Sequence, residues 1–185
     1  MNLPLKAVLL WWMSHLPWRL QPLVFGHVLC IGLYLVSFWW TMNSHNRNWN
    51  ILCWNFRGLN SFARCQAAQQ KIDESACSIF CLQETKKDLF DAKFVKTLAP
   101  KWFDNFFFSP SVGASRGVFI GWCSSMFSRV LLQQTQHALV VSFTSKLNGQ
   151  NWVLINVYRP SHGPQRDEFV LWLQDLDFAN DFWMI

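Results

Sequence analysis

Four short segments constrain this chain most, because each of them ends an apolar run with polar residues. They are WNFRGLN (54–60), LQET (82–85), SVGASRG (111–117) and NVYRP (156–160). If the apolar runs are neighbouring strands of one sheet, their carboxyl ends share one edge, and Asn55, Glu84 and Tyr158 come together there. An amide oxygen, a carboxylate and a phenol suit a magnesium ion and a phosphate. The segments therefore predict a metal and phosphate site at a sheet edge.

The hydrophobic periodicity from Trp49 onward is typical of alternating strands and helices, so we expect an α/β fold. The expected strands are 51–54, 76–82, 103–108, 118–122, 139–145 and 151–157, and the expected helices are 61–74, 86–98 and one from Pro164. A further strand begins at 182–185. Asn148-Gly149 predicts a tight hairpin turn, since this pair tolerates positive φ. The inward helix faces are expected to carry Phe62, Cys65, Ala68 and Ile72 in the first helix, and Phe169, Val170, Trp172, Leu173 and Leu176 in the last.

The order and wording of the four segments resemble the endonuclease/exonuclease/phosphatase superfamily, which includes deoxyribonuclease I and the apurinic/apyrimidinic endonucleases. The RGLN and LQETK wording is most similar to the endonuclease domain of plant non-LTR retroelements. The resemblance covers residues 49–185. It implies a partial four-layer α/β/β/α sandwich of the deoxyribonuclease I-like kind, truncated, together with magnesium-dependent hydrolysis of phosphodiesters in DNA and a nuclear location.

The resemblance also implies roles for single residues. Glu84 matches the main metal ligand and Asn55 a second residue at the metal, while Tyr158 matches a tyrosine that binds the scissile phosphate. Asn156, two residues earlier on the same strand face, is expected either to take part in catalysis or to support the edge. The third segment has Ser115-Arg116-Gly117 where the family has Ser-Gly-Gly. Arg116 either stores strain at a positive φ or reaches a phosphate beside Ser115, and both alternatives stay open.

Two segments of the superfamily have no counterpart in this sequence. Neither a Gly-Asp-x-Asn run nor an Asp-His pair follows the fourth segment. General acid–base groups alone contribute about 10²–10⁴-fold to such reactions. We therefore expect the amino-terminal part of a phosphodiesterase domain, inactive alone. The alternatives are an active phosphoesterase of the phosphatase or sphingomyelinase type, and a non-enzymatic, membrane-anchored remnant.

Residues 1–48 differ in kind from residues 49–185, and we expect a domain division between them. The run 23–40 is 18 residues long without a formal charge, about the minimum for a membrane-spanning helix, and predicts a membrane segment as one alternative. The other alternative is a leader without a role as protein. The net charge of +5 favours a polyanionic partner such as DNA, yet all 11 acidic residues follow residue 48, so the later part is nearly balanced.

The cysteines and histidines do not indicate zinc. The six cysteines form no CxxC pair, and the five histidines form no HxxxH spacing. Cys53, Cys77 and Cys81 lie in apolar runs, where a reduced thiol acts as a small hydrophobe. Magnesium is the expected cofactor, by resemblance, and a reducing compartment is favoured.

Overall fold

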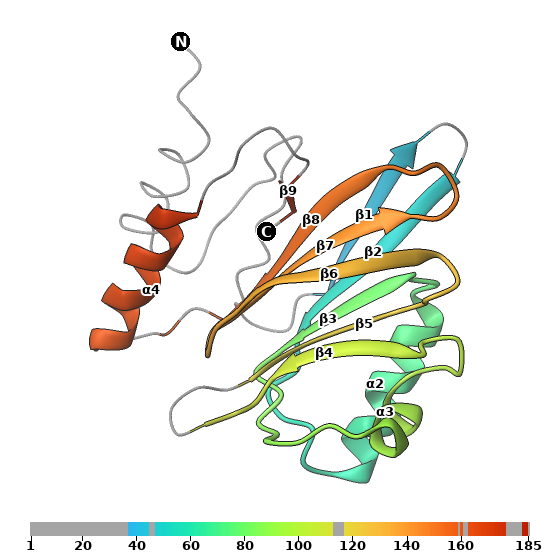
Figure 1. Ribbon diagram of the computed structural model, residues 1–185. Helices are drawn as coiled ribbons and strands as arrows, with labels where there is room; N and C mark the ends of the chain where they lie inside the picture. Colours follow the sequence, from blue (N-terminus) through green and yellow to red (C-terminus); the bar gives the residue numbers. More distant parts are fainter. Residues whose placement is uncertain are drawn as a thin grey trace.

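The computed structural model describes residues 37–44, 47–112, 117–158, 160, 163–176 and 183–184. In these residues two β-sheets pack face to face, with helices outside them (Figure 1). The helices are α2 (Phe62–Glu74), α3 (Ala92–Leu98) and α4 (Pro164–Asp175). The first two cover the outer face of one sheet, and α4 packs on strands of the other. This arrangement confirms the predicted α/β class and a partial sandwich of four layers.

The first sheet has five strands in the order β1-β2-β3-β5-β4. They are β1 (Ser37–Ser44), β2 (Arg47–Asn55), β3 (Ile79–Gln83), β5 (Val118–Trp122) and β4 (Asn105–Ser109). Strands β2 and β3 are parallel and in register from Ile51 with Ile79 to Asn55 with Gln83. Their carboxyl ends therefore meet at one edge, as expected for strands that carry the first two segments.

The second sheet has four strands in the order β6-β7-β8-β9. They are β6 (Phe127–Gln134), β7 (Ala138–Ser145), β8 (Asn151–Val157) and β9 (Trp183–Met184). The predicted hairpin between β7 and β8 is confirmed. Gly149 has a φ of 71°, and Asn148 Oδ1 accepts a hydrogen bond from the backbone N–H of Gln150 at 3.1 Å. Gly149 thus supplies the left-handed backbone that this turn requires.

Alternating residues of the strands divide the core into separate layers. Between the sheets lie large side chains such as Trp122 and Phe127 together with Trp152. On the outer face of the first sheet, Phe80 and Phe119 pack with residues of α2 and α3. Gly121 faces Phe80 in the strand register, and a Cβ atom placed there would overlap the Phe80 ring. The aromatic layer therefore depends on a residue without a side chain.

Side-chain hydrogen bonds join the edge strands β4 and β6 of the two sheets. Ser109 Oγ donates to the backbone oxygen of Thr135 at 2.6 Å, and Gln134 Nε2 donates to that of Phe108 at 3.2 Å. Arg129 Nη2 approaches Asn105 Oδ1 at 3.4 Å. These contacts close one long side of the sandwich.

The inward faces of α2 and α4 agree only in part with the predictions. Ser61 caps α2 by accepting a bond from the Arg64 N–H, and Cys65, Ala68 and Ile72 point inward as expected. Phe62 was wrongly expected inward, since it is 72% exposed. Phe169, Leu173 and Leu176 are buried, whereas Val170 and Trp172 are half-buried.

The second predicted helix starts later than expected. It begins at Ala92, where Asp91 Oδ1 accepts a hydrogen bond from the Phe94 N–H at 2.6 Å, and not at residue 86. Lys86 has a φ of 52°, which a continuing right-handed helix does not allow. The Lys87 carbonyl accepts a bond from Ser111 N at 2.9 Å, which ties this segment to the loop after β4 instead.

The expected membrane helix over 23–40 is wrong for its last four residues. Residues 37–40 belong to β1, which pairs antiparallel with β2, and 23–36 lie outside the described residues. An uncharged apolar run fits a strand as well as a helix, and the pairing of β1 with β2 decides between them. Within the described ranges, no helix is long and apolar enough to cross a membrane. The division at residue 48 stays a prediction.

Candidate metal and phosphate site

Asn55 and Glu84 meet at the edge where β2 and β3 end. Asn55 is the last residue of β2, and Glu84 follows β3 directly. Asn55 Nδ2 donates a hydrogen bond to Glu84 Oε1 at 3.1 Å, and the two side chains are 5% and 9% exposed. The structure therefore brings together the two residues expected at the metal.

Backbone hydrogen bonds between loops hold this pair in place. Phe56 N donates to the Gln83 carbonyl at 2.9 Å, and Leu59 N donates to that of Thr85 at 2.8 Å. Thr85 N in turn donates to the Gly117 carbonyl at 3.2 Å. The ends of β2, β3 and the start of β5 are thus linked in series, and the positions of Asn55 and Glu84 follow from the sheet.

The backbone around the pair adopts left-handed conformations at several non-glycine residues. Glu84 has a φ of 54°, Arg57 of 57° and Lys86 of 52°. Each such residue costs about 1–3 kcal/mol and persists only where surrounding contacts hold it. Arg64 supplies such contacts, because its Nη1 donates to the carbonyls of Arg57 and Gly58 at 2.8 and 3.2 Å. The sequence did not indicate this holding role of Arg64.

One acceptor at the site is left without a partner. Asn55 Oδ1 is buried and has no hydrogen-bond partner among the described residues. Buried polar atoms are normally satisfied, so an orphaned amide oxygen next to a carboxylate suits a hard cation. The fully buried Thr85 Oγ1 is also without a partner within the described ranges. The donor set at this edge therefore fits magnesium.

The protein supplies few ligands for such an ion. Among the described residues, no group of three or more His, Cys, Asp or Glu side chains lies close enough to hold a metal. Magnesium often binds through one or two carboxylates, with substrate phosphate and water completing the octahedron. Glu84 and the Asn55 amide oxygen match this sparse type of site.

Asn156 joins the two sheets directly behind the pair. Its Oδ1 accepts a hydrogen bond from Gln83 Nε2 at 2.6 Å, and its Nδ2 donates to the Phe119 carbonyl at 2.9 Å and to that of Leu82 at 3.4 Å. Asn156 is 1% exposed. These contacts fix the end of β8 against β3 and β5, and the role of Asn156 at the site stays a prediction. The role of Gln83 was not foreseen, because a link between two sheets has no signature in either strand alone.

Tyr158 follows β8 and lies next to His137. Its N–H donates to the His137 carbonyl at 2.7 Å, and the two ring centroids are 6.4 Å apart. Tyr158 is buried except for a small part of its surface. Asn156 contacts Gln83, the residue before Glu84. Because Tyr158 comes two residues after Asn156, it lies at the same end of the sandwich as Glu84.

His137 was not a predicted site residue. It is buried, and its Nδ1 has no hydrogen-bond partner in the described part of the chain. Burial lowers the pKa of His137 below its usual value, and the carboxylate of Glu168 opposes this shift. The imidazole is therefore neutral at pH 7.

Ser115 and Arg116, the two residues expected at the phosphate, lie outside the described residues, so their role stays a prediction. Their neighbour Gly117 has a φ of 70°, and a Cβ atom there would lie 2.6 Å from Thr85 Oγ1. The tight approach of β5 to the loop after β3 therefore requires glycine at this position.

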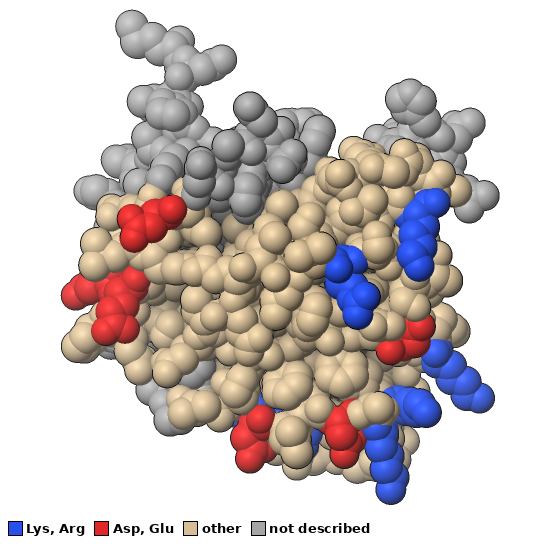
Figure 2. Space-filling model, in the orientation of Figure 1, with Lys and Arg blue, Asp and Glu red and all other residues tan. Residues whose placement is uncertain are grey.

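Surface charge around the site is mixed. On the face shown in Figure 2, Lys and Arg side chains alternate with Asp and Glu over the region of α2 and α3. No continuous basic surface covers this face among the residues that the structure describes. On this face, attraction for a polyanion would come from local groups of side chains.

Comparison with solved structures shows what this fold resembles. An AP endonuclease from Leishmania major matches with a TM-score of 0.51 and 16% identity, covering 74% of this chain and 49% of that one. TDP2 from D. rerio, complexed with single-strand DNA product, matches with a TM-score of 0.51 and 19% identity, covering 72% and 56%. The endonuclease domain of the non-LTR retrotransposon TRAS1 matches with a TM-score of 0.44 and 14% identity, covering 65% and 50%.

The AP endonuclease and TDP2 have the deoxyribonuclease I-like fold of the endonuclease/exonuclease/phosphatase superfamily, and the described part of this chain has part of that fold. The chain spans about half the length of each of these two proteins. No protein-family model matches the sequence, and no curated protein matches it. The resemblance expected from the four segments is thus confirmed at the level of fold.

Proposed function

We propose that this chain carries the metal-binding half of a DNA-processing, nuclease-type site that acts on phosphodiesters. The observation that carries the proposal is the contact of Asn55 with Glu84, which leaves a buried amide oxygen beside a carboxylate. Neighbours with this fold include a DNA endonuclease and a protein bound to single-strand DNA product, which supports DNA as the ligand. A nuclear location and a retroelement origin belong to the same proposal.

In this proposal Glu84 and Asn55 hold a magnesium ion, which when bound polarises a phosphoryl oxygen. Tyr158 provides a hydroxyl toward the phosphate, and Ser115 with Arg116 contact it from the third segment. Asn156 acts as a positioning residue, because its bonds to Gln83 and Phe119 fix the end of β8 against β3 and β5. The backbone links between the loops keep the pair in place before the substrate binds.

The same proposal includes low activity for the chain alone. Asn55 and Glu84 provide no base for the attacking water, because the carboxylate is committed to the metal. The sequence contains no Gly-Asp-x-Asn run or Asp-His pair after residue 160 to supply one. Proton transfer by a placed group contributes about 10²–10⁴-fold, so its loss alone would reduce nicking to a low level.

The test measures metal binding and activity separately. Calorimetric titration with magnesium should show weak binding by the full chain, and Glu84→Gln or Asn55→Leu should abolish it. Glu74→Gln is the matched control, because Glu74 is an exposed helical glutamate that bonds only Gln70 among the described contacts. Equal magnesium binding by all four proteins would refute the metal site.

Activity is followed by plasmid nicking in magnesium. We expect no nicking by the full chain above the level of its Glu84→Ala variant. Robust nicking that is lost in Glu84→Ala would overturn the proposed inactivity, while it would support the metal site.

A further inference from the structure

A pocket of about 520 Å³ lies between the start of α2, the loop after β3 and α3. The residues that matter here are Asn60 and Phe62 at the start of α2, Lys86 and Lys87 in the loop, and Phe94 in α3. We call this space the α2–α3 pocket. Its volume is within the range of about 300–1,000 Å³ that small-molecule sites occupy.

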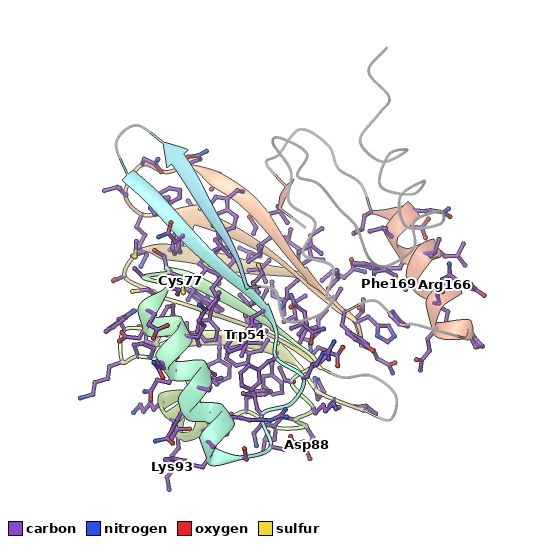
Figure 3. The ribbon with its side chains drawn as sticks, turned by 180° about the vertical axis from the view of Figure 1, so that it is seen from behind. Trp54, Cys77, Asp88, Lys93, Arg166 and Phe169 are labelled. Carbon is purple, nitrogen blue, oxygen red and sulfur yellow. The ribbon has the colours of Figure 1, made fainter. Side chains whose placement is uncertain are left out.

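The α2–α3 pocket is lined by parts of the two loops that follow Asn55 and Glu84. Leu59, which also lines it, donates its N–H to the Thr85 carbonyl, next to Glu84. A Cβ atom at Gly58 would lie 3.3 Å from Lys86 Cδ, so the Lys86 side chain crosses the strained loop that follows Asn55. Figure 3 shows Asp88, another lining residue, at the end of the sheet opposite the β1–β2 turn.

Two aromatic rings line the α2–α3 pocket, and only one of them has a face open to a ligand. Lys87 Nζ lies 4.2 Å from the centroid of the Phe94 ring, so this lysine already covers Phe94. Phe62 is 72% exposed although it opens a helix whose Cys65, Ala68 and Ile72 turn inward. Solvent exposure of a phenylalanine has no stabilising role in the fold, and its open face is a surface for stacking.

The charged side chains that line the pocket have a net positive charge. Lys86 and Lys87 line the pocket, and Asp88 is the one acidic residue among its described lining residues. The first turn of α2 contains no acidic side chain. The amino-terminal end of its dipole is therefore not compensated there, which favours an anion. An apolar ring next to cations matches a nucleobase joined to a phosphate.

We propose that the α2–α3 pocket binds one nucleotide of a single-stranded DNA segment, adjacent to the phosphodiester held at Glu84 and Asn55. The base stacks on Phe62, and the phosphate contacts Lys86. Single-stranded DNA is required because a paired base has both faces covered by its neighbours in the duplex, whereas an unpaired base can stack on an aromatic side chain. The inference deepens the proposed function and rests on it.

The experiment measures fluorescence anisotropy of a labelled 10-nucleotide DNA strand and of the same sequence as a duplex, in magnesium, with the full chain. Phe62→Ala should weaken single-strand binding by about 5- to 160-fold, the range for loss of one stacked base, and change duplex binding less than about twofold. Phe62→Trp should retain binding. Trp102→Ala is the matched control, because Trp102 is an exposed aromatic side chain outside the pocket, 52% accessible. It should leave both affinities unchanged.

Lys86→Gln tests the phosphate contact. The slope of log affinity against log salt for the single strand should become shallower by about 0.7, the value for one phosphate contact. Equal single-strand affinities of Phe62→Ala and Trp102→Ala, or equal losses for single strand and duplex, would overturn the pocket assignment. An unchanged salt slope in Lys86→Gln would overturn the proposed contact between Lys86 and the DNA phosphate.

The outcomes also separate this inference from the proposed function. If Glu84→Gln weakens DNA binding in magnesium while Phe62→Ala does not, the metal site stands and the pocket assignment fails. If Phe62→Ala weakens binding while Glu84→Gln has no effect with or without magnesium, the pocket stands and the metal site fails. Absence of DNA binding by the wild-type chain would refute both.

Discussion

The hydrogen bonds of Asn156 make a quantitative prediction about how the two sheets are held together. Asn156→Leu keeps approximately the same volume but leaves Gln83 Nε2 buried without its acceptor and removes the bonds to the Phe119 and Leu82 carbonyls. One unsatisfied buried donor costs about 1–3 kcal/mol, and each lost bond about 1 kcal/mol. Because carbonyls have a second lone pair, we expect a total loss of about 2–4 kcal/mol in the free energy of unfolding.

A double-mutant cycle isolates the contact between Gln83 and Asn156. Gln83→Leu alone should cost about 1–3 kcal/mol, because it leaves Asn156 Oδ1 unpaired. The double variant replaces both polar groups with apolar ones, so its loss should be smaller than the sum of the single losses by about 1–2 kcal/mol. Urea unfolding of the full chain, followed by tryptophan fluorescence, measures each value.

Asn151→Leu is the matched control, since Asn151 is an exposed asparagine at the start of the same strand. It should change stability by less than about 0.5 kcal/mol. The reasoning is refuted if Asn156→Leu is as mild as this control, or if the losses of Gln83→Leu and Asn156→Leu simply add. Either result would mean that apolar packing alone sets the distance between β3 and β8.

Three further predictions concern stability. Gly121→Ala should lower the free energy of unfolding by about 1–3 kcal/mol or more, because the new methyl group overlaps the Phe80 ring; a urea midpoint equal to that of wild type would contradict this packing. Gly149→Ala should cost only about 1–2 kcal/mol in the same assay, because a Cβ there meets no atom within 4 Å and only its φ of 71° is unfavourable. The lowered pKa of His137 means that below about pH 6.5 the unfolded chain binds a proton before the folded chain does, so stability should fall as pH is lowered from 7 toward 5, and less so in His137→Gln; identical pH profiles would show that the ring is not buried as described.

The sequence predicted the elements whose apolar runs fit either a strand or a helix but not both. β2 and β3 carry short buried runs that end in polar segments, and α2 follows a capping serine, so these elements and the meeting of Asn55 with Glu84 could be foreseen. The run that contains β1 could not be assigned in this way. A chain of uncharged apolar residues fits a helix or a strand, and only its pairing with β2 distinguishes them.

The missed elements and contacts depend on tertiary packing. β6 is an edge strand with a register shift after Leu131, and it exposes Val130 and Leu132, so it lacks the inward apolar alternation that identifies a strand. The same limit applies to the Gln83–Asn156 bond and to the burial of His137. Each depends on how one sheet lies on the other, which no local pattern encodes.

The side-chain bonds between β4 and β6 have a consequence for the order in which the molecule assembles. They join residues 24 to 26 positions apart, where the chain passes from the first sheet to the second, whereas the Gln83–Asn156 bond joins residues 73 positions apart. Closing the longer loop costs about 0.9 kcal/mol more in chain entropy. The contacts between β4 and β6 can therefore form before the more distant contact of Gln83 with Asn156. The Asn55–Glu84 contact joins residues only 29 positions apart and can form with the pairing of β2 and β3, whereas the Gln83–Asn156 bond, which fixes β8 behind them, is expected to form later.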